Sequence, residues 1–173
     1  MMPPPASFTP TDLTHATFTR RPGVTEARMS MMLDNHLDEV WSAITEPAQL
    51  AQWLAPGRIE LRPGGAVRID FADSGVVIDS AVTAIDPPHI LEYDWSGPGE
   101  PRRPVLFELE PIGAAVCLTL TVTAPAGEDA ARAAAGWAAH LDMLAAALAG
   151  APTKFPLELF IAARDAYRAE LAV

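Results

Sequence analysis

The chain has 173 residues, half of them hydrophobic, and its 12 basic and 22 acidic residues give a formal net charge of -10. This length suits one domain with a substantial core and is short for two. The acidic balance, without any cluster of Lys or Arg, argues against nucleic-acid and anionic-membrane partners. A single cysteine, no signal-peptide pattern and no long apolar run together predict a soluble, cytoplasmic protein.

The first 22 residues are rich in Pro, Thr and Ser and have no periodicity. We expect residues 1–22 to be a flexible arm, either loose throughout or ending in a strand that packs on the body. Residues 23–173 are expected to form a single domain that includes a C-terminal helical extension.

The domain is predicted to open with a strand at 24–33, followed by two short helices. Asp34 or Asn35 is the expected N-cap of the first helix, and Thr45 that of the second. The first helix is predicted from apolar residues that repeat at helical spacing, namely Leu37, Val40, Trp41 and Ile44.

From residue 57 the apolar period changes to two, which predicts a run of antiparallel strands. A hairpin is expected with Ile59 and Leu61 in its first strand and residues 67–71 in its second. Further strands are expected at 75–85, 89–95, 105–110 and 114–124. A long helix then follows over about 128–149, and residues 156–173 repeat an amphipathic helical pattern.

Three ordered segments carry a family resemblance: residues 40–57, 84–95 and 136–150. They resemble signatures of the family named for the activator of heat-shock protein 90 ATPase, in the wider START-like (SRPBCC) superfamily. The first matches at Val40, Trp41, Ala43, Ile44, Thr45, Pro47, Leu50 and Trp53. The second resembles an Ile-Asp-Pro-Pro-x-x-Leu-x-x-x-Trp segment, and the third a Gly-Trp-containing closing helix.

The resemblance implies an α+β helix-grip fold, in which a curved antiparallel sheet wraps a long C-terminal helix and encloses an apolar cavity. It implies no shared catalytic set. We expect a small apolar or aromatic ligand in that cavity, with no cofactor and no metal. Two alternatives stay open: a chaperone-activator-like interaction domain, and a cyclase- or hydrolase-like enzyme using His140 or Tyr93 as a proton donor. A homodimer is also left open.

The expected ligand-binding residues are apolar or aromatic side chains of the helix pair, the strands and the long helix, together with one histidine. They are Trp41, Trp53, Leu54, Ile69, Phe71, Tyr93, Trp95, Phe107, Leu118, Leu120, Trp137, His140, Leu141 and Leu144.

Three residues of the long helix need a particular explanation. Gly136 is expected to let the helix approach another backbone closely, and Trp137 to fill the narrow part of the cavity. His140 is either a polar group at the cavity margin or a core-edge histidine bonded to a carbonyl or water. In the first case, replacing it with Leu should change stability little and ligand preference more. The pair Arg102 and Arg103 is expected to be solvated surface.

Overall fold

The computed structural model describes residues 15–72 and 74–172. Eight antiparallel strands form one sheet in the order β1-β2-β8-β7-β6-β5-β4-β3. They are β1 (Ala16–Arg21), β2 (Val24–Leu33), β3 (Gly57–Ile59), β4 (Ala66–Phe71), β5 (Val76–Asp86), β6 (Ile90–Asp94), β7 (Pro104–Ile112) and β8 (Ala115–Pro125).

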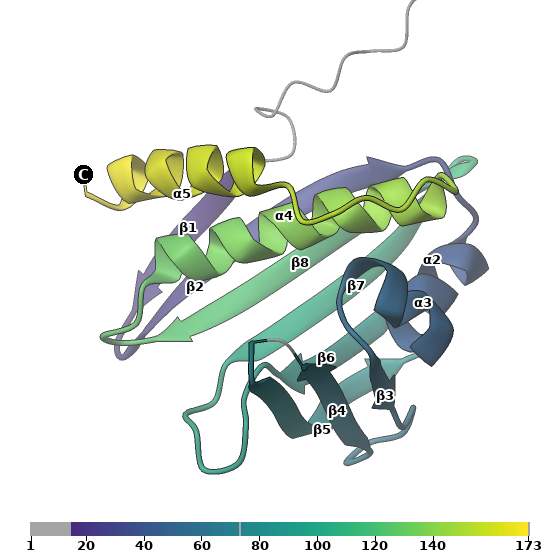
Figure 1. The fold of residues 1–173 in the computed structure, drawn as a ribbon, viewed down its shortest axis with the longest axis horizontal. Coiled ribbons are helices and arrows are strands. Elements are labelled where there is room, and N and C mark those ends of the chain that lie inside the picture. Colours follow the sequence, from purple (N-terminus) through teal and green to yellow (C-terminus); the bar gives the residue numbers. More distant parts are fainter. Residues whose placement is uncertain (1–14, 73, 173) are drawn as a thin grey trace, which may run out of the picture.

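Four helices accompany this sheet in the described part of the chain. They are α2 (Leu37–Thr45), α3 (Pro47–Trp53), α4 (Ala130–Leu148) and α5 (Leu157–Leu171). Helix α4 lies along one face of the sheet, while α2 and α3 lie at one end and α5 runs beside α4 (Figure 1). The predicted α+β helix-grip fold, with two short helices after the 24–33 strand, is confirmed.

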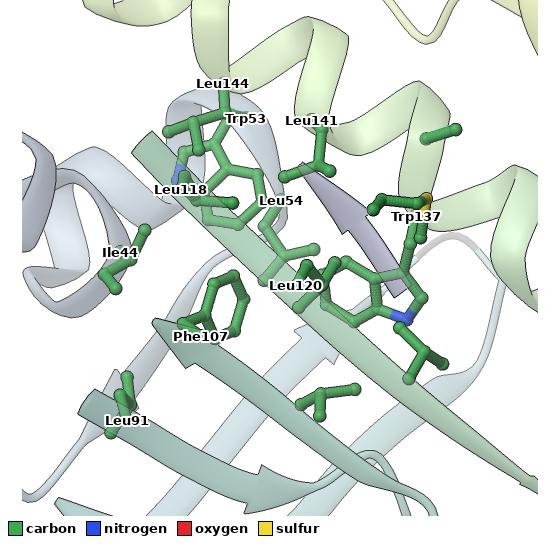
Figure 2. Packing of buried hydrophobic residues seen from close by; sticks show 14 of the residues in the cluster. Ile44, Trp53, Leu54, Leu91, Phe107, Leu118, Leu120, Trp137, Leu141 and Leu144 are labelled. Atoms are coloured by element: carbon green, nitrogen blue, oxygen red, sulfur yellow. The ribbon is translucent and has the colours of Figure 1, made fainter. Parts of the chain in front are cut away.

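The core lies between α4 and the sheet because the central strands β6, β7 and β8 alternate buried and accessible side chains. In β8, Val116, Leu118, Leu120 and Val122 are buried, and the residues between them are partly accessible. Such alternation turns one side of a strand toward the core. Trp53, Leu54, Phe107 and Leu141 continue this packing between the helices and the strands (Figure 2).

Residues 16–21, which fall within the expected arm, form an edge strand. β1 pairs with β2 from Ala16 opposite Met29 to Arg21 opposite Val24. The ordered domain therefore includes residues before 23. The rest of the expected arm, residues 1–14, lies outside the described residues.

The expected helix caps are wrong. The N-cap residue of α2 is His36, and the amide of Asn35 instead donates to Glu39 at 3.3 Å. The N-cap residue of α3 is Glu46, while the Thr45 hydroxyl donates back to the main-chain oxygen of Trp41 at 2.7 Å. The Asn35 and Thr45 side chains are thus engaged in other hydrogen bonds and do not accept from the free N–H groups at the start of α2 or α3.

One hairpin residue also departs from its predicted position. β3 ends at Ile59, and Leu61 lies in the connection to β4, where it is 45% exposed. The Glu60 and Gly65 N–H groups bond the main-chain oxygens of Ala66 and Arg62, so the turn begins before Leu61 can join the buried face.

Helix α5 packs on α4 and on the edge of the sheet. Tyr167 is 1% exposed and meets the ring of Phe18 edge to face at 5.3 Å. Arg168 pairs with Asp129 at 2.7 Å, which ties α5 to the start of α4. No helix in the described part of the chain is long and apolar enough to cross a membrane.

Candidate functional site

A pocket of about 680 Å³ lies between the first half of α4, the ends of the neighbouring strands and the segment that leads into α5. Helix α4 lines it with Arg132, Ala133, Gly136, Trp137 and His140. Strands and loops contribute Phe71, Ser74, Val76, Trp95 and Arg103, and the C-terminal segment contributes Phe155, Leu157 and Phe160. Glu128 and Asp129 complete the lining at the start of α4.

The α4 residues meet in the pocket because of their spacing. Positions 132, 133, 136, 137 and 140 repeat at intervals of three and four, which places them on one face of an α-helix. Asp129 fixes where that face begins, because its carboxylate accepts the N–H of Arg132 at 3.0 Å and so caps the helix.

Aromatic rings form the walls of the pocket. Trp95 and Trp137 meet edge to face with ring centroids 4.7 Å apart, and Phe71 contacts Trp95 at 5.9 Å. His140 lies among them, 6.1 Å from Phe71 and 5.5 Å from Phe155. These contacts offer flat apolar surfaces to an occupant.

Gly136 leaves part of the pocket open. A Cβ built on this residue would meet no atom within 4 Å, apart from its own helix and chain neighbours. The expectation that Gly136 permits a close backbone approach is therefore wrong. Its missing side chain instead contributes empty space on the pocket side of α4.

His140 is held by the end of α3. Its Nδ1 lies 2.9 Å from the main-chain oxygen of Trp53. Burial lowers the pKa of His140 below its ordinary value, and the bond to Trp53 opposes this shift only in part. The imidazole is therefore neutral at physiological pH, and both expected roles meet in one residue: it bonds a carbonyl and also lines the pocket.

The polar rim is largely neutralised by ion pairs. Arg103 contacts both carboxylate oxygens of Glu128, with the shortest separation 2.8 Å, and pairs with Glu100 at 2.8 Å. The hydrogen bond from Arg103 is the main cause that lowers the pKa of Glu100. The expectation of solvated surface for the arginine pair is confirmed for Arg102, whose side chain is 68% exposed, but not for Arg103, whose side chain is 24% exposed.

A second rim carboxylate is also paired. The hydrogen bond from Arg168, followed by that from the Arg132 N–H, lowers the pKa of Asp129. The Arg132 side chain is exposed and makes no ion pair within residues 15–72 and 74–172. The free positive charge of the rim is therefore at Arg132 rather than at Arg103.

The structure divides the sequence-predicted site residues into two groups. Phe71, Trp95, Trp137 and His140 line the pocket together. The others do not line the pocket. Trp41 is partly buried on α2, and the rest lie in the buried core: Trp53, Leu54, Ile69, Tyr93, Phe107, Leu118, Leu120, Leu141 and Leu144. Figure 2 shows Trp53, Phe107 and Leu141 of this group packed between helices and strands.

Several pocket residues were missed by the sequence reasoning. The helical spacing of Arg132, Ala133 and Gly136 with Trp137 and His140 was a usable signal for that face of α4. No sequence pattern indicated that Phe155, Leu157 and Phe160 line the pocket, because their positions depend on the path of the chain after α4. Among the described residues, no group of three or more His, Cys, Asp or Glu side chains could hold a metal ion.

Solved structures share this fold. The crystal structure of CalU16 from Micromonospora echinospora matches with a TM-score of 0.75 and 23% identity, covering 90% of this chain and 96% of that one. The solution structure of the protein encoded by gene BPP1335 from Bordetella parapertussis matches with a TM-score of 0.69 and 30% identity, covering 83% and 84%. DynU16, a protein in the dynemicin biosynthetic locus, matches with a TM-score of 0.65 and 31% identity. That match covers 73% of this chain and 48% of DynU16, so this chain spans about half of it.

No curated protein matches this chain. The sequence profile described as "Activator of Hsp90 ATPase homolog 1-like protein" matches residues 34–149, which is more than half of the chain and contains the helix pair, the strands β3 to β8 and α4. The chain belongs to the Activator of Hsp90 ATPase homolog 1-like protein family.

Proposed function

We propose that this protein binds a small aromatic or apolar molecule in the pocket between α4, the sheet and residues 155–160. The observation that carries this proposal is the set of aromatic walls around a space of about 680 Å³. Small-molecule sites are typically concave, mostly apolar and about 300–1,000 Å³ in volume. Gly136 supports the same function, because a glycine inside a helix costs stability and here leaves pocket space.

The enzymatic alternative is less well supported by the positions of its two residues. Tyr93 is 1% exposed and does not line the pocket, and burial raises its pKa. His140 holds its Nδ1 against a carbonyl, so a proton-donor role would require a second proton on a ring whose pKa burial has lowered. The chaperone-interaction alternative depends on a partner surface and is an outcome of the test below.

The test uses 2-methoxynaphthalene, an uncharged aromatic probe, in titration calorimetry with the full-length protein. We expect saturable binding of one probe per chain. A ligand at about 100 times its Kd should also stabilise the protein by roughly 2.7 kcal/mol. Gly136→Leu places a side chain in the pocket and should abolish binding while the protein stays folded.

Ala146→Leu is the matched control, because it adds the same side chain to α4 at a residue that does not line the pocket. This variant should bind the probe as the wild type does. Unchanged binding in a folded Gly136→Leu protein would contradict the proposed site. If neither 2-methoxynaphthalene nor related naphthalenes and indoles bind the wild type, while a purified chaperone does, the interaction role replaces the binding role.

A further inference from the structure

The hydrogen bond of His140 fixes which of its ring nitrogens carries the proton. A main-chain carbonyl only accepts hydrogen bonds, so Nδ1, 2.9 Å from the Trp53 oxygen, must be the donor. In the neutral ring the other nitrogen, Nε2, then has a free lone pair and can only accept.

The Nε2 atom has no hydrogen-bond partner within the described parts of the chain, 15–72 and 74–172. The ring that carries it lines the pocket and lies against the rings of Phe71, Trp137 and Phe155. Nε2 is therefore an acceptor set among the aromatic rings of the pocket, whereas the carboxylates of Glu128 and Asp129 line its other part and are paired with Arg103 and Arg168.

Among the described residues, the buried side-chain polar atoms without a partner are on Asp94 and Tyr167, so Nε2 of His140 is accessible to water in the empty pocket. An occupant that covers Nε2 without donating to it leaves this acceptor unsatisfied, so an occupant that donates gains affinity over one that does not.

We propose that the pocket selects flat aromatic molecules that carry a hydroxyl or N–H donor, and that this group donates to Nε2 of His140. This selectivity rests on the proposed function and names the ligand class of the same site. An occupant with a carboxylate at this position would face the lone pair of Nε2 and is disfavoured. Arg103 does not offset this at the rim, because Glu100 and Glu128 already neutralise it. The free charge of Arg132 belongs to the other end of the α4 face, eight residues or about 12 Å along the helix from His140.

Two probe pairs test the donor requirement near pH 7.5: 2-naphthol against 2-methoxynaphthalene, and indole against 1-methylindole. Each pair differs by one methyl group that removes the donor. Burial of apolar surface alone favours the methylated member of each pair, because it has the larger apolar area. Tighter binding of the member with the donor is therefore due to the hydrogen bond. We expect the donor of each pair to bind about tenfold more tightly.

His140→Phe keeps a ring in the pocket and removes the acceptor. In this variant the preference for the donor probe should disappear, while 2-methoxynaphthalene still binds. Retention of the full preference in a folded His140→Phe protein would overturn the assignment to Nε2.

Ring nitrogen NMR of the wild type provides a readout that does not depend on a variant. The Nε2 resonance of His140 should move with 2-naphthol and not with 2-methoxynaphthalene. His89 is the internal control, because its Nδ1 lies 3.1 Å from the Leu109 oxygen in the same arrangement but outside the pocket. Its resonances should not respond to either probe.

The outcomes separate this inference from the function on which it rests. If no probe of either pair binds, the proposed function fails and the selectivity fails with it. If both members of each pair bind equally and the His140 Nε2 resonance stays unmoved, the pocket binds aromatic molecules but the donor requirement is overturned.

Discussion

His140 and Trp53 lie 87 residues apart in the sequence and are joined by one hydrogen bond, from Nδ1 of the imidazole to the main-chain oxygen at the end of α3. The last main-chain carbonyls of a helix have no hydrogen-bond partner within that helix. His140 of α4 donates to one of these carbonyls at the end of α3, that of Trp53. The same ring faces the pocket. The position of α3 and the polar group of the site therefore depend on a single side chain.

Replacing His140 with Leu should lower the free energy of unfolding by about 1–3 kcal/mol, because the Trp53 carbonyl loses its partner in a buried environment. This differs from the sequence-based expectation of little change, which did not include the bond to α3. Urea denaturation of both proteins measures the difference. A change within about 0.5 kcal/mol would show that the bond adds nothing to stability.

The stability of the protein should fall as the pH drops below about 6.5, the ordinary pKa of histidine. Burial lowers the pKa of His140 in the folded state, so the unfolded chain takes up this proton first. The contribution of His140 to the free energy of unfolding is fully present above pH 6.5 and is lost as the pH falls toward the pKa of this residue in the folded protein.

Urea denaturation at pH 7.5 and 5.5 checks this effect, with His140→Leu as the reference. His15, His36 and His89 are present in both proteins, so their contributions cancel in the comparison. The lowered pKa values of Glu100 and Asp129 act below this window. An equal pH dependence in the two proteins would rule out His140 as the source.

Gly136→Ala should raise the free energy of unfolding by about 0.5–1 kcal/mol, because alanine is the better helix residue and its Cβ meets open space. This differs from the sequence-based expectation of a close backbone approach at Gly136, which would leave no room for an added side chain. Thermal or urea unfolding provides the measurement. A destabilised alanine variant would mean that the pocket closes around Gly136 in solution.

The sequence predicts those features of the structure that depend on neighbouring residues, and it misses those that depend on contacts between residues distant in the sequence. Alternation in residues 114–124 predicted β8, because each side chain of a strand faces the core or solvent according to its own position. The prediction that Asn35 caps α2 was wrong, because its side-chain amide donates hydrogen bonds to Glu39 and to the main-chain oxygen of Leu148, which is distant in the sequence. Local patterns carry no information on such partners.

The same distinction applies to the site. Trp137 and His140 were predicted from their unusual place in an alanine-rich helix, and both line the pocket. Phe155 was missed because its role comes from contact with His140, at 5.5 Å, after the chain turns back beyond α4. Nothing in residues 150–156 alone specifies that return.

Trp137→Ala should cost about 3–5 kcal/mol, since it removes a ring that is 5% exposed and packs on Trp95 and Phe107. Trp137→Phe should cost less, because a ring remains in the same place. The free energy of unfolding from urea titration separates the two variants. Trp41→Ala is a useful comparison, because its partly buried side chain on α2 should matter less. Equal costs at positions 41 and 137 would contradict the role of Trp137 in the core.

Tyr167→Phe should leave the stability unchanged or raise it by about 1 kcal/mol. The Tyr167 hydroxyl is buried and has no hydrogen-bond partner among residues 15–72 and 74–172. Its removal from water on folding is therefore unfavourable, and no hydrogen bond compensates for it. The ring itself holds α5 against Phe18 of β1. Tyr167→Ala should therefore cost about 3–5 kcal/mol, as for the loss of other buried aromatic rings. Urea denaturation of both variants makes the comparison, because only the hydroxyl distinguishes the first from the wild type. A loss of more than about 1 kcal/mol in Tyr167→Phe would show that the hydroxyl has a bonded partner in solution, and α5 would then be held by a polar contact as well as by the ring.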